Sequence, residues 1–294
     1  MKRMTAVLRE MLVSGKIMVY PGIYDALSAK IAERVGFKMV GLGGYALGAH
    51  LGTPEPLLCL EDLVRACRYI TAAITIPLKV DADAGFGEPL HVMRTIRELE
   101  SAGVAAAHIE DQIYPKRVHY HKGIEHVIDT QDMIAKLKAA AAARRDPDFV
   151  IIARTDAMRT DGFADGVRRA NLYLEAGADM AFIFPNNVEE ARQAPKEICG
   201  PLVYLNSDGN RLGRPIFSIQ ELEDMGYRMV SYAISCINVA VKANKEMLET
   251  LLATGRTGVD QKEITGIRKY IEDTIGLEEM YKLEIATVEG RKGS

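Results

Sequence analysis

The chain has 294 residues, of which 48% are hydrophobic and 26% charged, and a net charge of −3; this is typical of a globular protein without a basic surface for nucleic acid or acidic membranes. No apolar run is long enough to span a membrane, and residues 1–16 lack the core of a signal peptide. The four cysteines (Cys59, Cys67, Cys199 and Cys236) form no CxxC pair and no metal-site spacing, which favours a reducing, cytoplasmic setting.

Strand-length apolar runs alternate with amphipathic segments along the chain. Four of the runs follow a glycine expected to end a helix in a left-handed cap: Gly36, Gly103, Gly177 and Gly226. The other four predicted strands are Ile17–Tyr20, Thr75–Val80, Phe149–Arg154 and Leu202–Asn206. Predicted helices include Tyr24–Val35, Leu60–Ala72, Pro89–Ala102, Thr130–Arg144 and Phe163–Ala176. This alternation predicts a parallel sheet closed into a TIM (β/α)8 barrel, with 1–294 as a single domain because no linker interrupts it.

Two segments beyond the eighth strand, Ser235–Thr254 and Gln261–Thr287, also have helical periodicity. The second has an apolar face with little left to cover in its own barrel: Ile264, Ile267, Tyr270, Ile271, Ile275, Leu277 and Met280. We therefore expect the helices from about 235 to 294 to pack on a neighbouring subunit.

The stretch Lys79–Gly87 carries two carboxylates directly after a predicted strand. Asp81 and Asp83 are two residues apart and share a face of an ideal strand, where they repel each other unless a cation or a shared proton relieves them. Carboxylate oxygens suit a hard cation such as Mg2+. The alternative interpretation is a solvated loop rich in turn-forming Asp and Gly.

A barrel would gather these acids with other polar groups, because the carboxyl ends of its strands meet at one mouth. The groups expected there are Gly43, Gly44, Tyr45, Asp81, Asp83, Glu110, Asp111, Gln112, Arg154, Thr155, Asp156 and Asn206. Arg154 could hold a carboxylate through two parallel hydrogen bonds. It could equally form a structural salt bridge with Asp156 or Glu110.

Four motifs resemble the isocitrate lyase and phosphoenolpyruvate mutase superfamily, in its short-chain branch with 2-methylisocitrate lyase and 2,3-dimethylmalate lyase. They are the stretches 20–29 (YPGIYDALSA), 80–87 (VDADAGFG), 108–112 (HIEDQ) and 152–157 (IARTDA). The resemblance implies a TIM barrel and a homotetramer with swapped C-terminal helices.

The resemblance also implies a ligand set. Mg2+ or Mn2+ would bind near Asp81, Asp83, Glu110 and Glu55, the last in a Gly-Thr-Pro-Glu stretch that replaces the family's Gly-x-Pro-Asp. An α-oxo acid or its enolate would be chelated to that metal. The residues expected to hold the substrate are Gly43, Gly44, Tyr45, Arg154, Asn206 and Asn186.

The sequence departs from the family in its acid–base groups. Family lyases carry a catalytic cysteine on a loop after strand four, and Val118 stands at that position here, with Tyr120 in place of a histidine. The family's Tyr-Leu-Ser-Gly is Gly-Leu-Gly-Gly at 41–44, and its Phe-Pro-Glu ends in Asn186. We therefore assign proton transfer to His119, Tyr120 or His121, with Tyr45 as a second candidate. Lys116 and Arg117, which match the family's loop, complete the predicted catalytic residues. A solvated basic loop, and packing of Tyr45 at the barrel rim, are the alternative interpretations.

The predicted function is a Mg2+-dependent carbon–carbon bond lyase. It would cleave a 2-hydroxy dicarboxylate resembling 2-methylisocitrate or 2,3-dimethylmalate to an α-oxo acid such as pyruvate. The alternatives are an oxaloacetate decarboxylase or hydrolase, a phosphonopyruvate enzyme, or a barrel that binds α-oxo acids without turning them over.

Overall fold

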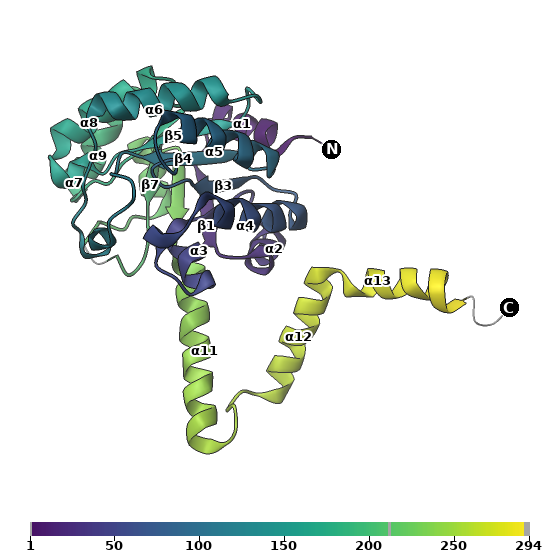
Figure 1. The fold of residues 1–294 in the computed structure, drawn as a ribbon. Helices are drawn as coiled ribbons and strands as arrows, with labels where there is room; N and C mark the ends of the chain where they lie inside the picture. Colours follow the sequence, from purple (N-terminus) through teal and green to yellow (C-terminus); the bar gives the residue numbers. More distant parts are fainter. Residues whose placement is uncertain (1, 211–212, 291–294) are drawn as a thin grey trace. The chain divides into compact units, whose positions relative to one another are not determined.

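The computed structural model describes residues 2–210 and 213–290. Its first compact unit, which ends at Ile237, contains eight parallel strands that pair in sequence order and close into a barrel (Figure 1). Pairing of β8 with β1, for example Ser231 with Tyr20, completes the closure. The strands are β1 Met18–Ile23, β2 Val40–Leu42, β3 Leu78–Asp81, β4 Ala106–Glu110, β5 Val150–Arg154, β6 Met180–Phe182, β7 Leu202–Leu205 and β8 Met229–Tyr232.

Helices connect these strands and cover the outside of the barrel (Figure 1). In this unit they are α1 Met4–Val13, α2 Ala26–Val35, α3 Gly44–Leu51, α4 Leu60–Ala73, α5 Pro89–Ser101, α6 Thr130–Ala143, α7 Ala157–Thr160, α8 Phe163–Glu175, α9 Val188–Glu197 and α10 Ile219–Met225. Short 3-10 turns lie at Glu55–Leu57 and Val118–Lys122.

Helix α1 covers the amino-terminal end of the barrel. Leu8 is fully buried in the same cluster as the barrel-interior residues Met18 and Met39. Arg9 donates hydrogen bonds to the backbone oxygen atoms of Asp148 and Phe149, just before β5 begins. The opposite end, where the strands finish, is therefore the end available for a site.

The predicted barrel is confirmed, and its strands lie on the predicted apolar runs, with small shifts at their ends. β3 begins at Leu78 instead of Thr75, after Pro77, which has no N–H to donate to a strand ladder. α2 begins at Ala26 instead of Tyr24, because the side chain of Asp25 accepts a 2.7 Å hydrogen bond from the backbone N–H of Ser28 and caps the helix there.

A second compact unit begins at Asn238 and contains most of α11 (Ser235–Thr254), α12 (Gln261–Ile275) and α13 (Leu277–Glu284), followed by a π-helical turn at Ile285–Glu289. The predicted helix at Ser235–Thr254 is confirmed. The predicted helical segment Gln261–Thr287 is also helical in the structure, and Gly276, with a left-handed φ of 76°, divides it into α12 and α13. Among the described residues, no helix combines the length and the apolar character that crossing a bilayer requires.

Candidate active site

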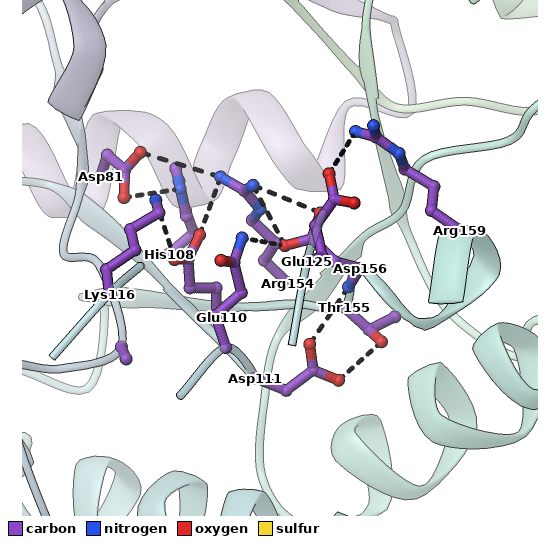
Figure 2. Close-up of polar contacts among 12 residues, drawn as sticks. Asp81, His108, Glu110, Asp111, Lys116, Glu125, Arg154, Thr155, Asp156 and Arg159 are labelled. Carbon is purple, nitrogen blue, oxygen red and sulfur yellow. Dashed lines mark hydrogen bonds and ion pairs between the residues drawn. The ribbon is translucent and has the colours of Figure 1, made fainter. Parts of the chain in front are cut away.

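Three strands deliver charged side chains to the carboxyl end of the barrel. Asp81 ends β3, Glu110 ends β4 and Arg154 ends β5, and all three are buried. Arg154 Nη1 lies 3.0 Å from Glu110 Oε2 and 3.9 Å from Asp81 Oδ2 (Figure 2). The prediction that these three groups meet, because the carboxyl ends of barrel strands lie at one mouth, is confirmed. Arg154 points toward the two acids.

A fourth charge, the ammonium group of Lys116, lies among the acids. It donates a 2.7 Å hydrogen bond to Glu55 Oε1, and it lies 2.9 Å from Glu110 Oε1 and 3.9 Å from Asp83 Oδ2. Lys116 comes from the loop after β4, so this loop reaches into the mouth of the barrel (Figure 2). The acid cluster formed by Glu55, Asp81, Asp83 and Glu110 thus already surrounds one positive charge.

The surroundings push the pKa values of the cluster apart. Burial raises the pKa of Glu110 to about 8, although the charges of Arg154 and Lys116 oppose the rise. Burial also acts to raise the pKa of Asp81, but His108, Lys116 and Arg154 outweigh it and bring that pKa well below its usual value. At neutral pH the site therefore contains a carboxylate at Asp81 and a carboxyl group at Glu110 that binds its proton unusually tightly.

The donor chemistry of the cluster fits Mg2+. Within residues 2–210 and 213–290, no three His, Cys, Asp or Glu side chains converge to form a ready metal cage. Mg2+ does not require one, since it is usually held by one or two carboxylates, with water and substrate oxygen atoms completing its shell. Oε2 of Glu55 is buried without a hydrogen-bond partner among the described residues. The two oxygen atoms of Glu110 lie 2.9 Å from Lys116 Nζ and 3.0 Å from Arg154 Nη1, so a divalent cation bound here would replace or share these ion pairs.

Glycines bring the backbone of α3 close to the cluster. Gly43 precedes α3, and the backbone N–H of Gly44 lies 3.5 Å from Asp81 Oδ2. A β-carbon on Gly44 would come within 2.8 Å of Glu55 Oε1, so any larger residue would displace that carboxylate. The N–H group of Gly44, at the start of α3, therefore faces Asp81 and could stabilise an anionic ligand bound beside it.

The backbone after β3 is strained at Asp83, which takes a φ of 51° although it is not a glycine. Its backbone N–H donates a 2.9 Å hydrogen bond to Asp81 Oδ1, and its own Oδ1 accepts one from the N–H of Ala84. This tight turn holds the two carboxylates of the motif in place at the mouth, which is where strained backbone is most often retained.

The loop after β4 brings one ring of the proton-transfer candidates onto the cluster. The ring of Tyr120 lies 4.1 Å from Lys116 Nζ and 5.9 Å from the guanidinium carbon of Arg154, measured to the ring centroid. His121 contacts the rings of Tyr120 and Tyr45 at 4.8 and 5.9 Å. His119 and Arg117 are exposed.

The two asparagines expected to bind substrate are used by the fold. The side chain of Asn206 bonds to both backbone groups of Phe217, at 2.8 and 3.0 Å, and so fastens the loop after β7. Asn186 is exposed, and its amide donates to the backbone oxygen of Met158 and to Glu190. The side-chain N–H donors of both asparagines are thus already occupied.

A second row of buried groups supports Arg154. Asp156 lies 3.1 Å from Arg154 Nη2 and accepts a 2.7 Å hydrogen bond from Gln112. Asp111 accepts hydrogen bonds from the hydroxyl of Thr155 and from the backbone N–H of Asp156 (Figure 2). Arg154 therefore forms the structural ion pairs considered from the sequence, while its buried Nε keeps no partner among the described residues.

One buried group was missed from the sequence. Lys79 lies inside the barrel, where its ammonium group contacts Nδ1 of His108 and lies 5.6 and 5.3 Å from the ring centroids of Tyr20 and Phe182. His108 Nε2 in turn lies 3.0 Å from Asp81 Oδ1. The signal was a charged residue within an apolar strand, two positions before Asp81 and so on the same inward face.

Comparisons with known proteins agree with this geometry. A family model described as phosphoenolpyruvate phosphomutase matches residues 8–252. The chain is 37% identical over 289 residues to 2,3-dimethylmalate lyase of Eubacterium barkeri, covering 97% of this chain and 99% of that protein. It is 38% identical over 259 residues to 2-methylisocitrate lyase of Aeropyrum pernix, covering 87% of this chain and 82% of that protein.

Solved structures with the same fold span several activities. A crystal structure of 2,3-dimethylmalate lyase has a TM-score of 0.89 at 31% identity and covers 98% of this chain and 96% of its own. Oxaloacetate acetylhydrolase in complex with 3,3-difluorooxalacetate has a TM-score of 0.89 at 29% identity, with coverages of 99% and 98%. Phosphonopyruvate hydrolase in complex with oxalate and Mg2+ has a TM-score of 0.84 at 28% identity, with coverages of 98% and 100%.

Proposed function

This chain belongs to the phosphoenolpyruvate mutase and isocitrate lyase superfamily, and on that premise we propose that it is a Mg2+-dependent carbon–carbon bond lyase. Its substrate would be a 2-hydroxy dicarboxylate similar to 2,3-dimethylmalate, or the related tricarboxylate 2-methylisocitrate, and one product an α-oxo acid such as pyruvate. The observation that carries the proposal is the acid cluster gathered around a cation beside Arg154.

The cluster supplies the binding half of the reaction. Magnesium, when bound, supplies a Lewis acid that stabilises negative charge on the oxygen atoms of an oxo acid. Asp81, Asp83, Glu110 and Glu55 are the side chains that would hold it, with Lys116 moving aside. Arg154 would bind the carboxylate of the oxo-acid end through its unpaired Nε, and the N–H of Gly44 would contribute a second donor.

The other half of the reaction moves two protons. A base removes the proton of the 2-hydroxyl group, the C2–C3 bond breaks, and carbon 3 takes the electron pair and then a proton. Burial raises the pKa of Tyr120, so its hydroxyl stays protonated at neutral pH and can act as the donor. In support of this role, the ring of Tyr120 lies over the Lys116 ammonium group, next to the acid cluster proposed to hold the metal.

A substrate screen tests the proposal. The protein is incubated with Mg2+ and, in turn, 2,3-dimethylmalate, 2-methylisocitrate, oxaloacetate and phosphonopyruvate, and the products are identified by mass spectrometry. We expect pyruvate from one of the 2-hydroxy dicarboxylates, and none after chelation of the metal. Oxalate and acetate from oxaloacetate would instead assign a hydrolase, the activity of one structural relative. If no compound gave a product but pyruvate bound in a Mg2+-dependent way, the protein would be a barrel that binds α-oxo acids without turning them over.

A further inference from the structure

A second arginine lies beside the proposed substrate site, on the loop between β7 and α10. The guanidinium carbon of Arg214 lies 4.8 Å from the ring centroid of Phe184. The guanidinium carbon of Arg154 lies 4.6 Å from the same centroid. One aromatic ring therefore supports two guanidinium groups, and stacking of this kind orients the flat face of an arginine while leaving its N–H edge available.

Arg214 differs from the neighbouring arginines, because no acidic side chain in the described part of the chain pairs with it. Arg154 pairs with Glu110 and Asp156, and Arg159 lies 2.9 Å from Glu125 Oε1. Within residues 2–210 and 213–290, no Asp or Glu forms an ion pair with Arg214, and the hydrogen bonds that it makes to these residues involve its backbone. The half-buried guanidinium group therefore has no acceptor for its N–H donors among the described residues.

The electrostatic surroundings of Arg214 favour an anion. Burial, followed by the positive charges of Arg159 and Arg154, lowers the pKa of Arg214 to about 10, against opposing effects of Tyr204 and Asp156. The group still carries its charge at neutral pH. An anion bound here would relieve both the desolvation and the repulsion between like charges.

The loop that carries Arg214 is bonded to itself through Asn210 and to the barrel through Tyr204 of β7. The backbone N–H of Arg214 donates a 2.7 Å hydrogen bond to Asn210 Oδ1, and the hydroxyl of Tyr204 donates a 2.6 Å bond to the backbone oxygen of Pro215. Asn206 holds Phe217 in the same way. The side chain is therefore presented by an anchored segment, and little ordering entropy remains to oppose binding.

We propose that Arg214 determines specificity by binding the second, distal carboxylate of the substrate, while Arg154 and the acid cluster hold the oxo-acid end. This inference rests on the proposed function, since it assigns the other half of the same substrate. The planar guanidinium can form two parallel hydrogen bonds to a carboxylate, so a substrate without a distal carboxylate is rejected.

Binding measurements test this without requiring turnover. The ligands are 2-hydroxybutanedioate and 2-hydroxypropanoate, which differ in the distal carboxylate, titrated calorimetrically in the presence of Mg2+. Arg214→Met keeps the packing on Phe184 but removes the charge. Arg214→Lys keeps the charge but loses the planar guanidinium group that forms two parallel hydrogen bonds. Arg94→Gln, at an exposed position on α5, is the control. We expect Arg214→Met to weaken binding of the dicarboxylate about 30-fold and Arg214→Lys to weaken it less. Binding of the monocarboxylate should not change, and Arg94→Gln should behave as wild type.

The outcomes separate this inference from the proposed function. Equal losses for both ligands, unchanged binding of the dicarboxylate in Arg214→Met, or no preference of the wild type for the dicarboxylate would overturn the role of Arg214. A wild type that prefers the dicarboxylate through Arg214 but cleaves no compound in the product screen would overturn the lyase proposal and leave the subsite in place.

Discussion

Lys116 is the residue on which the charge balance of the site depends. Its buried ammonium group touches two carboxylates and lies near a third, and burial alone would lower its pKa; the charges of Glu110 and Glu55 instead raise it well above the ordinary value. The lysine therefore stays charged and occupies the position toward which the acids are directed. A divalent cation and this ammonium group should compete for the same oxygen atoms.

Lys116→Met should consequently bind Mg2+ more tightly than the wild type, by roughly tenfold, because the competing charge is gone. Lys122→Met on the same loop is the matched control, since Lys122 is exposed. Calorimetric titration of Mg2+ without substrate measures both. Equal or weaker Mg2+ binding by Lys116→Met would show that the lysine and the metal do not share a site.

Lys79 should make the free energy of unfolding depend on pH. Burial lowers the pKa of Lys79 to about 7, from 10.5 in the unfolded chain, so between these values the unfolded chain binds more protons than the folded one. Stability should therefore rise with pH in this window, by about 1 kcal/mol per pH unit near pH 8 to 9. The cost of burying the charged lysine is full below the folded pKa and disappears as the pH rises above the unfolded pKa.

Lys79→Met isolates this effect. The free energy of unfolding of the wild type minus that of Lys79→Met, measured by urea titration, should increase from pH 7.5 to pH 9. The same difference for Lys138→Met should stay flat, because Lys138 is exposed on α6. A flat difference for Lys79→Met would mean that the ammonium group is not desolvated in the folded protein.

The sequence allowed some of these residues to be predicted and not others. The positions of Asp81, Glu110 and Arg154 could be predicted, because each residue ends a strand and the carboxyl ends of barrel strands meet at one mouth. The place of Lys116 depends on the path of a loop that has no periodic pattern. The roles of Lys79 and Arg214 depend on which side chains face them across the barrel, and contacts of that kind are not local in sequence.

The 3-10 turn at Val118–Lys122 carries three candidates for the proton donor: His119, Tyr120 and His121. Of its side chains, Tyr120 lies nearest the acid cluster, while His119 is exposed. Tyr120→Phe should therefore lower kcat by about 100-fold with little change in KM, as expected for loss of a proton donor.

His119→Ala and His121→Ala complete this comparison, with Lys122→Ala as a loop control, all in steady-state assays on the substrate found in the screen. His119→Ala should stay close to wild type. His121→Ala should lose less than Tyr120→Phe, because its ring supports Tyr120 from the side. Full activity in Tyr120→Phe together with a large loss in either histidine variant would transfer the donor role to that histidine.

Among the secondary-structure elements, four of the strands were predictable because each follows a glycine that ends a helix. Gly36 and Gly226 end α2 and α10 at φ values of 116° and 104°, and the next apolar run begins a strand. The break between α12 and α13 was not predictable in the same way. The apolar periodicity continues through Gly276, and an isolated glycine within a helical pattern is often tolerated.

At the scale of the whole molecule, the C-terminal helices predict an oligomer. Ile267, Ile271 and Ile275 on α12 are 50%, 37% and 51% exposed, at helical spacing that places them on one face. An apolar face of this kind usually marks an interaction surface. We propose that it packs on a neighbouring copy of the chain, within a homotetramer.

Sedimentation of a matched pair of variants tests this proposal. Replacing Ile267 and Ile271 by Lys should convert a tetramer into smaller species, because two charges would have to be buried in the interface. Lys262→Gln, on the opposite side of α12, should leave the mass unchanged. A wild type that sediments as a monomer, or a double variant that remains a tetramer, would rule out this role for α12.

The claim on which the rest depends is that the acid cluster and Arg154 hold an oxo acid together with Mg2+. The most direct measurement is a calorimetric titration of pyruvate into the wild-type protein with and without Mg2+. We predict binding at least about 100-fold tighter with the metal, since a Lewis acid at this position is worth several kcal/mol. The same affinity with and without Mg2+ would contradict the account.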